Sequence, residues 1–140
     1  MNSSKIYLEH ANITVSDLNK SIEFFTTAFP HFKVRGGGEG NRKWIHLGDD
    51  VTYLALNEAK PTDQSIINDY DTKGFNHIGF VVENVVAIAD RLMAAGYQRN
   101  YPKQIQPFRI RDYFLDADGN EYEFVEYLSD KTEERNSYDD

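Results

Sequence analysis

Two stretches of the chain decide the fold: His10-Ala-Asn-Ile-Thr-Val-Ser-Asp-Leu18 and His77-Ile-Gly-Phe-Val-Val-Glu-Asn-Val85. The second stretch lies 67 positions after the first, which is about half of the 140-residue chain. Histidine aligns with histidine at the start of both stretches, and Asp17 aligns with Asn84 near their ends. Each copy of such a repeat is one supersecondary unit. The repeat therefore predicts a chain of two similar halves.

Each copy begins with alternating residues, which is typical of a half-buried strand. The side chains expected on the face away from the core are His10, Asn12 and Thr14 in the first copy and His77, Gly79 and Val81 in the second. Asp17 and Asn84 then stand where the N-cap of a helix belongs. Apolar residues follow at helical spacing in both copies, so a helix should pack on the sheet.

Further short strands, separated by turns, are predicted after each helix. They span residues 33–35, 43–47 and 52–56 in the first copy, and 98–101, 110–115 and 121–128 in the second. The glycine-rich segment 36–40 is predicted to be a flexible hairpin or lid, because it lacks the Lys-Ser/Thr of a phosphate-binding loop.

The predicted fold class is therefore α+β, with two βαβββ modules in a single domain, 1–140. Module one covers about residues 6–58 and module two about residues 75–128. The segment between them, about 59–74, is interpreted as a linker with a short helix around Ile66 and Ile67. Residues 129–140 are interpreted as a frayed polar tail.

Composition excludes several classes of function. The net charge of -8, from 15 basic and 23 acidic residues, argues against binding to the phosphates of a nucleic acid. No apolar run is long enough to span a membrane, and the polar start lacks the apolar stretch of a secretory signal, so a cytoplasmic protein is expected. The chain has no cysteine, so any metal ligands must be histidines or carboxylates.

His10 and His77 occupy equivalent places in the two copies. Either one alone would more often be a hydrogen-bonded histidine on a partly buried strand, but a matched pair favours a site. Segment 121–126 adds three carboxylates, and strand alternation separates Glu121 and Glu123 from Glu126. Glu123 is the best inward candidate. Two histidines and one carboxylate suit Fe(II), Mn(II), Zn(II) or Ni(II), with positions left for a substrate or water.

Three motifs, in this order, carry a family resemblance: Leu8-Glu-His10 with Val15-Ser-Asp17-Leu18, then Phe75-Asn-His77-Ile-Gly-Phe80, then Tyr113-Phe-Leu-Asp116-Ala-Asp118-Gly119-Asn120 with Glu123. Through them, about residues 6–128 resemble the vicinal oxygen chelate superfamily. This superfamily includes glyoxalase I, methylmalonyl-CoA epimerase, bleomycin resistance proteins, fosfomycin-modifying thiol transferases and extradiol dioxygenases.

The resemblance implies that the two modules form an open barrel with one metal-binding cleft. By motif position, His10, His77 and Glu123 would hold one divalent ion (Mn, Ni, Zn or Fe). It also implies assembly as a homodimer, because paired modules in this family often assemble across subunits.

At several positions this sequence departs from the patterns of individual enzymes in the superfamily, and these departures argue against some of their reactions. Segment 52–56 has no carboxylate or imidazole where glyoxalase I and the epimerase carry a fourth ligand, a glutamate. No histidine occurs between Gln98 and Asp112, where the acid-base histidine of extradiol dioxygenases would be expected. Lys103 and Tyr113 resemble the phosphonate-contacting pair of the fosfomycin enzymes, but Asn12 stands where a threonine is usual. The reaction is therefore unassigned.

The leading hypothesis is a metal-dependent enzyme acting on a small, anionic substrate with vicinal oxygens, of lyase, isomerase or thiol-transferase type. The candidate catalytic residues are Tyr113 and Lys103, and the candidate substrate-binding residues are Asn12, Trp44, Arg109 and Arg111. The alternative for the arginines is that they are charges on an edge strand or pair with the abundant acids, and the alternative for Trp44 is core packing. The alternative function is a metal-free small-molecule or drug-binding protein of the bleomycin resistance type.

Overall fold

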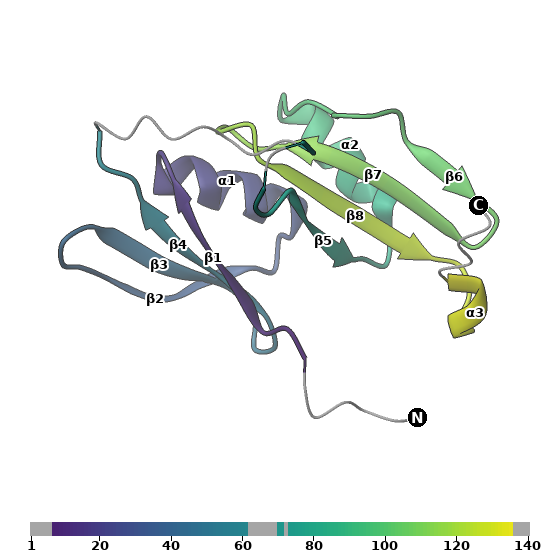
Figure 1. Ribbon diagram of the computed structural model, residues 1–140, viewed down its shortest axis with the longest axis horizontal. Helices are drawn as coiled ribbons and strands as arrows, with labels where there is room; N and C mark the ends of the chain where they lie inside the picture. Colours follow the sequence, from purple (N-terminus) through teal and green to yellow (C-terminus); the bar gives the residue numbers. More distant parts are fainter. Residues whose placement is uncertain (1–6, 62–69, 72, 136–140) are drawn as a thin grey trace. The chain divides into compact units, whose positions relative to one another are not determined.

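The computed structural model describes residues 7–61, 70–71 and 73–135. The chain divides into two compact units, Met1–Gln64 and Ser65–Asp140, and this boundary falls within the predicted linker. Each unit contains a strand, a helix and three further strands in that order (Figure 1). The predicted α+β class with two βαβββ modules is therefore confirmed. The strands form two separate open sheets of four strands each.

In the first unit, the elements are β1 (His10–Val15), α1 (Leu18–Ala28), β2 (Lys33–Glu39), β3 (Lys43–Gly48) and β4 (Tyr53–Glu58). The sheet order is β1-β4-β3-β2, with β1 parallel to β4 and the other pairs antiparallel. Helix α1 packs on β3 and β4. The buried side chains on this side of the sheet include Val15, Leu47, Leu54 and Leu56.

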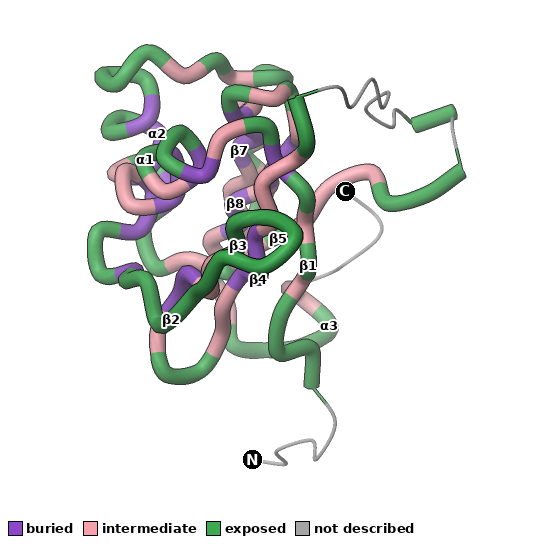
Figure 2. Tube along the Cα trace, turned by 90° about the vertical axis from the view of Figure 1, so that its left-hand side faces the viewer, coloured by how far each residue is buried: buried purple, intermediate pink, exposed green. Residues whose placement is uncertain are grey.

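In the second unit, the elements are β5 (His77–Val81), α2 (Val85–Ala94), β6 (Gln104–Gln106), β7 (Arg109–Leu115) and β8 (Glu121–Tyr127), followed by the short α3 (Thr132–Arg135). The sheet order is β5-β8-β7-β6, with β5 parallel to β8. Helix α2 packs on β7 and β8, where Phe114, Tyr122 and Phe124 are buried (Figure 2). In both units, we call the sheet face away from the helix the open face.

The helices begin in the same way in both units. Asp17 accepts hydrogen bonds from the amides of Asn19 and Lys20, and Asn84 accepts one from Ala87, so both are N-caps, as predicted. A glutamate from the last strand of each unit adds a second cap. Glu58 accepts from the first amide of α1 at 3.1 Å, and Glu126 accepts from the first amide of α2 at 2.9 Å.

These two glutamates define which residues of β4 and β8 are equivalent. Ala55 and Glu123 each lie three residues before the capping glutamate of their strand, so they are equivalent. Tyr53 and Glu121 each lie five residues before it and are also equivalent. The register agrees, because Tyr53 lies opposite His10 and Glu121 lies opposite His77. The first unit therefore carries an alanine at the position that Glu123 occupies in the second.

Two predictions about local structure are wrong. The glycines of segment 36–40 do not form a hairpin turn: Gly36, Gly37 and Gly38 lie within β2 and pair with β3. Gly38 lies opposite Trp44, and a Cβ at this position would come within 3.1 Å of the indole nitrogen. Because Gly38 has no side chain, the Trp44 ring can lie against the strand. Glycine also favours turns, and the amino-acid sequence alone does not show which of the two roles a glycine has.

The strand predicted at 98–101 lies elsewhere. Arg99 makes only an isolated bridge to Phe114, and the edge strand is β6, Gln104–Gln106. Arg99 instead directs its side chain to Asp112. The tail predicted to be frayed begins with the helical turn α3, and the helix predicted around Ile66 and Ile67 lies outside the described residues.

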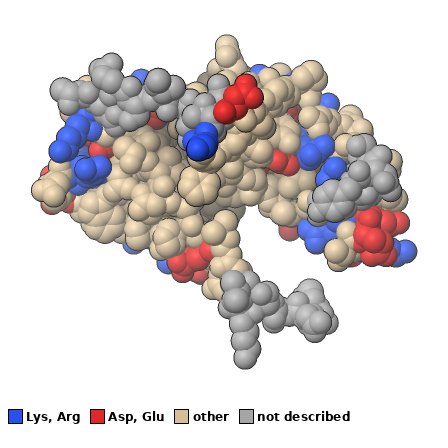
Figure 3. All heavy atoms as spheres, viewed as in Figure 1, with Lys and Arg blue, Asp and Glu red and all other residues tan. Residues whose placement is uncertain are grey.

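None of the helices in the described part of the chain is long and apolar enough to cross a membrane. On the face shown in Figure 3, basic and acidic side chains lie in small, separate groups among other residues.

An ion pair inside the second unit joins Arg99 to Asp112 of β7 and stabilises that strand. Asp112 is fully buried, and its two oxygens accept from Nε and Nη2 of Arg99 at 2.7 and 2.8 Å. We expect Asp112→Asn to lower the free energy of unfolding by about 3 kcal/mol, near the low end for a broken buried pair, because Arg99 is partly exposed and can recover water. Urea unfolding measures this change. The exposed Asp50→Asn is the control, with a change within about 0.5 kcal/mol, and a loss below about 1 kcal/mol in Asp112→Asn would contradict the assignment.

Candidate functional site

The open face of the second sheet brings together three of the candidate residues from the sequence, namely His77, Glu123 and Tyr113. In the register, His77 lies opposite Glu121, and Glu123 lies between Gly79 on one neighbouring strand and Tyr113 on the other. Because alternate residues of a strand share a face, these side chains project to the side away from α2. Glu123 therefore lies on the open face, whereas Glu126 caps α2 on the opposite side of the sheet.

The imidazole of His77 lies between two carboxylates. Its Nε2 is 3.0 Å from Oε1 of Glu123, and its Nδ1 is 3.2 Å from Oε2 of Glu121. Nδ1 is also 2.8 Å from Oδ1 of Asn76. The ring therefore presents one edge to Glu123 and the other to Glu121 and Asn76.

Glu121 is held by more than the histidine. The hydroxyl of Tyr70 donates to its Oε2 at 2.7 Å, and the amide nitrogen of Asn100 donates to its Oε1. The side chain of Glu121 is only 7% exposed. Tyr70 is 61% exposed as a whole, but desolvation of its hydroxyl and the hydrogen bond to Glu121 raise its pKa above the ordinary value, so this tyrosine remains a hydrogen-bond donor.

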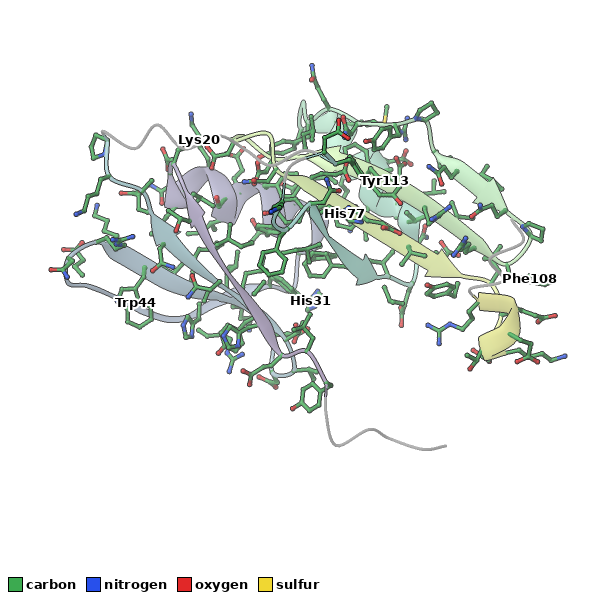
Figure 4. All side chains as sticks on the ribbon, viewed as in Figure 1. Lys20, His31, Trp44, His77, Phe108 and Tyr113 are labelled. Carbon is green, nitrogen blue, oxygen red and sulfur yellow. The ribbon has the colours of Figure 1, made fainter. Side chains whose placement is uncertain are left out.

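Tyr113 stands beside the histidine on the same face (Figure 4). Its ring meets that of His77 edge to face, with the centroids 5.7 Å apart, and Tyr113 lies opposite Glu123 in the register of β7 and β8. Burial, together with the nearby charge of Glu123, raises the pKa of Tyr113 to about 12, although Arg111 opposes this shift. The phenol therefore keeps its proton at neutral pH and can donate it.

The basic residues expected in the site are less closely grouped. Arg111 shares the face of Tyr113, and its Nε is buried without a hydrogen-bond partner among the described residues. Arg109 also shares this face but donates to Gln106 at 2.8 Å. Lys103 precedes β6, the edge strand on the far side of β7 from β8.

The donor atoms of His77 and Glu123 fit a divalent ion. An imidazole nitrogen and a carboxylate oxygen meet 3.0 Å apart, and both are ligand types that Mn(II), Fe(II), Zn(II) and Ni(II) accept. Within residues 7–61, 70–71 and 73–135, no cluster of three or more His, Cys, Asp or Glu side chains is arranged to hold a metal ion. His77 and Glu123 thus form a pair of candidate ligands in the second unit, while His10 belongs to the first.

The open face of the first sheet carries a row of rings. His10 stacks on Tyr53 with the centroids 4.7 Å apart, His46 stacks on Tyr53 at 4.6 Å, and Trp44 lies 5.2 Å from His46. The guanidinium of Arg35 also lies over Tyr53, 4.5 Å from its centroid. We call the rings of His10, Tyr53, His46 and Trp44 the aromatic row.

Trp44 and Asn12, both predicted to bind substrate, lie on this face. Trp44 is 38% exposed and packs over Gly38, so it is not part of the core beneath α1. Asn12 accepts a hydrogen bond from Asn57 at 2.6 Å on the neighbouring strand. The alternative of simple core packing for Trp44 is therefore wrong.

Several residues around His77 were missed in the sequence. Strand alternation already placed Glu121 on the same face as Glu123, so it could have been found. Tyr70, Asn76 and Asn100 come from loops, and no periodic pattern marks them. Only the folded unit shows that they contact His77 or Glu121.

Residues 7–124 match the family model described as Glyoxalase/Bleomycin resistance protein/Dioxygenase superfamily. No curated protein matches the chain.

Three solved structures illustrate the likeness in fold. A glyoxylase/bleomycin resistance protein/dioxygenase domain from Frankia sp. EAN1pec has a TM-score of 0.76 at 24% identity and covers 94% of this chain and 98% of its own. The fosfomycin resistance protein FosX from Listeria monocytogenes has a TM-score of 0.71 at 23% identity, covering 99% of both chains. TnmS3, an antibiotic binding protein from Streptomyces sp. CB03234, has a TM-score of 0.63 at 20% identity, covering 90% of this chain and 99% of its own.

Trp44 is the only tryptophan in the chain, so its fluorescence reports on the aromatic row. Three indole atoms lie 3.1 to 3.3 Å from where a Cβ at Gly38 would stand. We expect Gly38→Ala to lift the ring toward water, which shifts its emission to longer wavelength and makes acrylamide quenching faster. Gly36→Ala is the matched control, because a Cβ there has nothing within 4 Å. An unchanged spectrum in Gly38→Ala, or an equal change in both variants, would contradict this packing.

Proposed function

Because the chain belongs to the Glyoxalase/Bleomycin resistance protein/Dioxygenase superfamily, we propose that it is a divalent-metal-dependent enzyme acting on a small, anionic substrate with vicinal oxygens. The observation that carries this proposal is the meeting of Nε2 of His77, the carboxylate of Glu123 and the phenol of Tyr113 on one open sheet face. A histidine and a carboxylate can serve as metal ligands, and a phenol can serve as a proton donor.

The proposed ligands are His77 and Glu123 from the second unit and His10 from the first. The ion would be Mn(II), Ni(II), Zn(II) or Fe(II), because all of these accept imidazole and carboxylate ligands. Such an ion, held by these residues, would supply a Lewis acid for negative charge that develops on a substrate oxygen.

Tyr113 is the proposed proton donor. Its pKa, raised to about 12, keeps the hydroxyl protonated, and its position beside Glu123 directs it to the same part of the face. A phenol in this state can donate a hydrogen bond to a developing oxyanion or transfer its proton to it.

Arg111 is the proposed anchor for the anionic part of the substrate. Its unpaired Nε and its place two residues before Tyr113 support this role, because a guanidinium binds carboxylate or phosphate groups with parallel hydrogen bonds. Lys103 and Arg109 are proposed to orient the same group. Asn12 and Trp44 are proposed to contact the substrate from the first unit.

The reaction type is narrowed by Ala55. A fourth carboxylate ligand acting as the base is not available at this position of β4, so a glyoxalase I type of mechanism is not proposed. Lyase and thiol-transferase reactions, and isomerisations that use another base, remain in the proposal.

Assembly as a homodimer, a single domain over residues 1–140 and a cytoplasmic location stay predictions from the sequence.

One observation favours a second function, the binding of a small molecule without turnover. The aromatic row offers stacked and partly exposed rings, which suit a flat organic ligand. The antibiotic binding protein TnmS3 shares the fold, which supports this alternative. Metal binding separates the two proposals, because the binding protein needs no ion.

The first test is metal analysis of protein purified without added metal, followed by titration with Mn(II), Ni(II), Zn(II) and Fe(II). We expect tight binding of at least one ion by the wild type. His77→Ala should lower the affinity by at least about 100-fold, because the loss of a ligand exceeds the 10- to 100-fold cost of losing an outer hydrogen bond. His31→Ala is the control, since His31 is 63% exposed and bonded to Asp49. If the wild type binds none of these ions tightly, the enzyme proposal fails and the binding protein takes its place.

The second test is an activity panel on the metal-loaded protein. We expect weak or no activity with methylglyoxal hemithioacetal, because β4 has no carboxylate base, and with catechols, because no histidine lies between Gln98 and Asp112. Fosfomycin with a thiol is the third substrate in the panel, and a turnover there should fall sharply in Tyr113→Phe. Robust glyoxalase or ring-cleaving activity would show that another residue supplies the missing base.

A further inference from the structure

We propose that Glu121 is a positioning residue that fixes the orientation and tautomer of His77, so that Nε2 of the ring is left to bind a divalent ion. This inference rests on the metal site proposed above. It concerns a residue that the ligand set does not include, and it makes a claim that can be measured without any metal.

The imidazole geometry separates the roles of the two carboxylates. Glu123 faces Nε2 at 3.0 Å, whereas Glu121 faces Nδ1 at 3.2 Å, on the other edge of the ring. An ion bound through Nε2 can therefore share His77 with Glu123 but not with Glu121. This excludes Glu121 as a further ligand of the same ion in this ring orientation.

The surroundings of Glu121 fit an orienting role. Its side chain is 7% exposed, Tyr70 donates to Oε2 at 2.7 Å, and Asn100 donates to Oε1. Each carboxylate can only accept a hydrogen, so Glu121 draws the hydrogen of a neutral ring to Nδ1 and Glu123 draws it to Nε2; the proposal is that the more firmly held Glu121 prevails. Asn76, whose Oδ1 is 2.8 Å from Nδ1, acts in the same direction. Partners of this kind hold the tautomer of metal-binding histidines and raise their basicity.

The first unit shows the same principle with different residues. At the position equivalent to Glu121, Tyr53 stacks on His10 with an interplanar angle of 11°. Nδ1 of His10 is 2.9 Å from a carboxylate, that of Glu9. In both units, then, Nδ1 faces a carboxylate, and in the second unit Nε2 faces Glu123, the other proposed ligand. The carboxylate is exposed in the first unit, where it belongs to Glu9, and buried in the second, where it belongs to Glu121.

The test compares the wild type with Glu121→Gln, Glu121→Asp and Glu126→Gln. Glu126→Gln is the matched control, because Glu126 lies on the same strand but caps α2 on the opposite side of the sheet. The first readout is the ¹H–¹⁵N spectrum of the histidine rings in metal-free protein at about pH 9, where an ordinary histidine is neutral. The second is the affinity for Zn(II), used as the probe ion.

We expect the wild type and Glu126→Gln to show His77 with its hydrogen on Nδ1. In Glu121→Gln the hydrogen should move at least partly to Nε2, next to Glu123, and the Zn(II) affinity should fall by about 10- to 100-fold. Glu121→Asp, which keeps the carboxylate, should restore part of the affinity. An unchanged tautomer in Glu121→Gln, or an affinity within about three-fold of the wild type, would overturn the proposal.

The two readouts keep this inference distinct from the proposed function. If the wild type binds no Zn(II) but the tautomer still changes in Glu121→Gln, the metal site fails while the orienting contact stands. Circular dichroism checks that each variant folds. Should Glu121→Gln not fold, Tyr70→Phe replaces it, because it loosens Glu121 without removing the charge. A smaller shift of the tautomer is expected there, and no shift would overturn the proposal.

Discussion

The parallel pairing of the first strand with the last strand in each unit is the constraint on which the candidate site depends. The register of β5 with β8 puts His77 opposite Glu121 and one step from Glu123, while the antiparallel pairing of β8 with β7 adds Tyr113. A slip by one residue would turn all of these side chains toward the helix. The apolar residues between them prevent such a slip, because Tyr122 and Phe124 are buried beneath α2. The packing of the core therefore sets the chemistry of the open face.

The same pairing is present in the first unit, but the residues at the equivalent positions differ. Where the second unit has Glu121 and Glu123 beside its histidine, the first has Tyr53 and Ala55. The result is an aromatic row in place of a charged cluster. The open face of the first unit thus presents rings, and that of the second unit presents carboxylates and a phenol.

Much of this organisation could be predicted from the sequence because it is periodic. The repeat, the N-caps and the faces of the strands follow from spacing, and they located His10, His77, Glu123 and Tyr113 correctly on their strands. What could not be predicted depends on contacts between segments without a pattern. Nothing in the spacing places Tyr70 and Asn100 against Glu121, and Gly38 looks like a turn residue until its contact with Trp44 is seen. Nor does a sequence specify a reaction, because members of one fold differ in a few side chains of the open face.

The most direct test of the account is a crystal structure of the protein grown with Mn(II), with the ion located by its anomalous scattering. The account predicts an ion bound by Nε2 of His77 and by the carboxylate of Glu123, with Nδ1 of the same ring still facing Glu121. An ion bound through Nδ1, or bound away from His77 altogether, would contradict it.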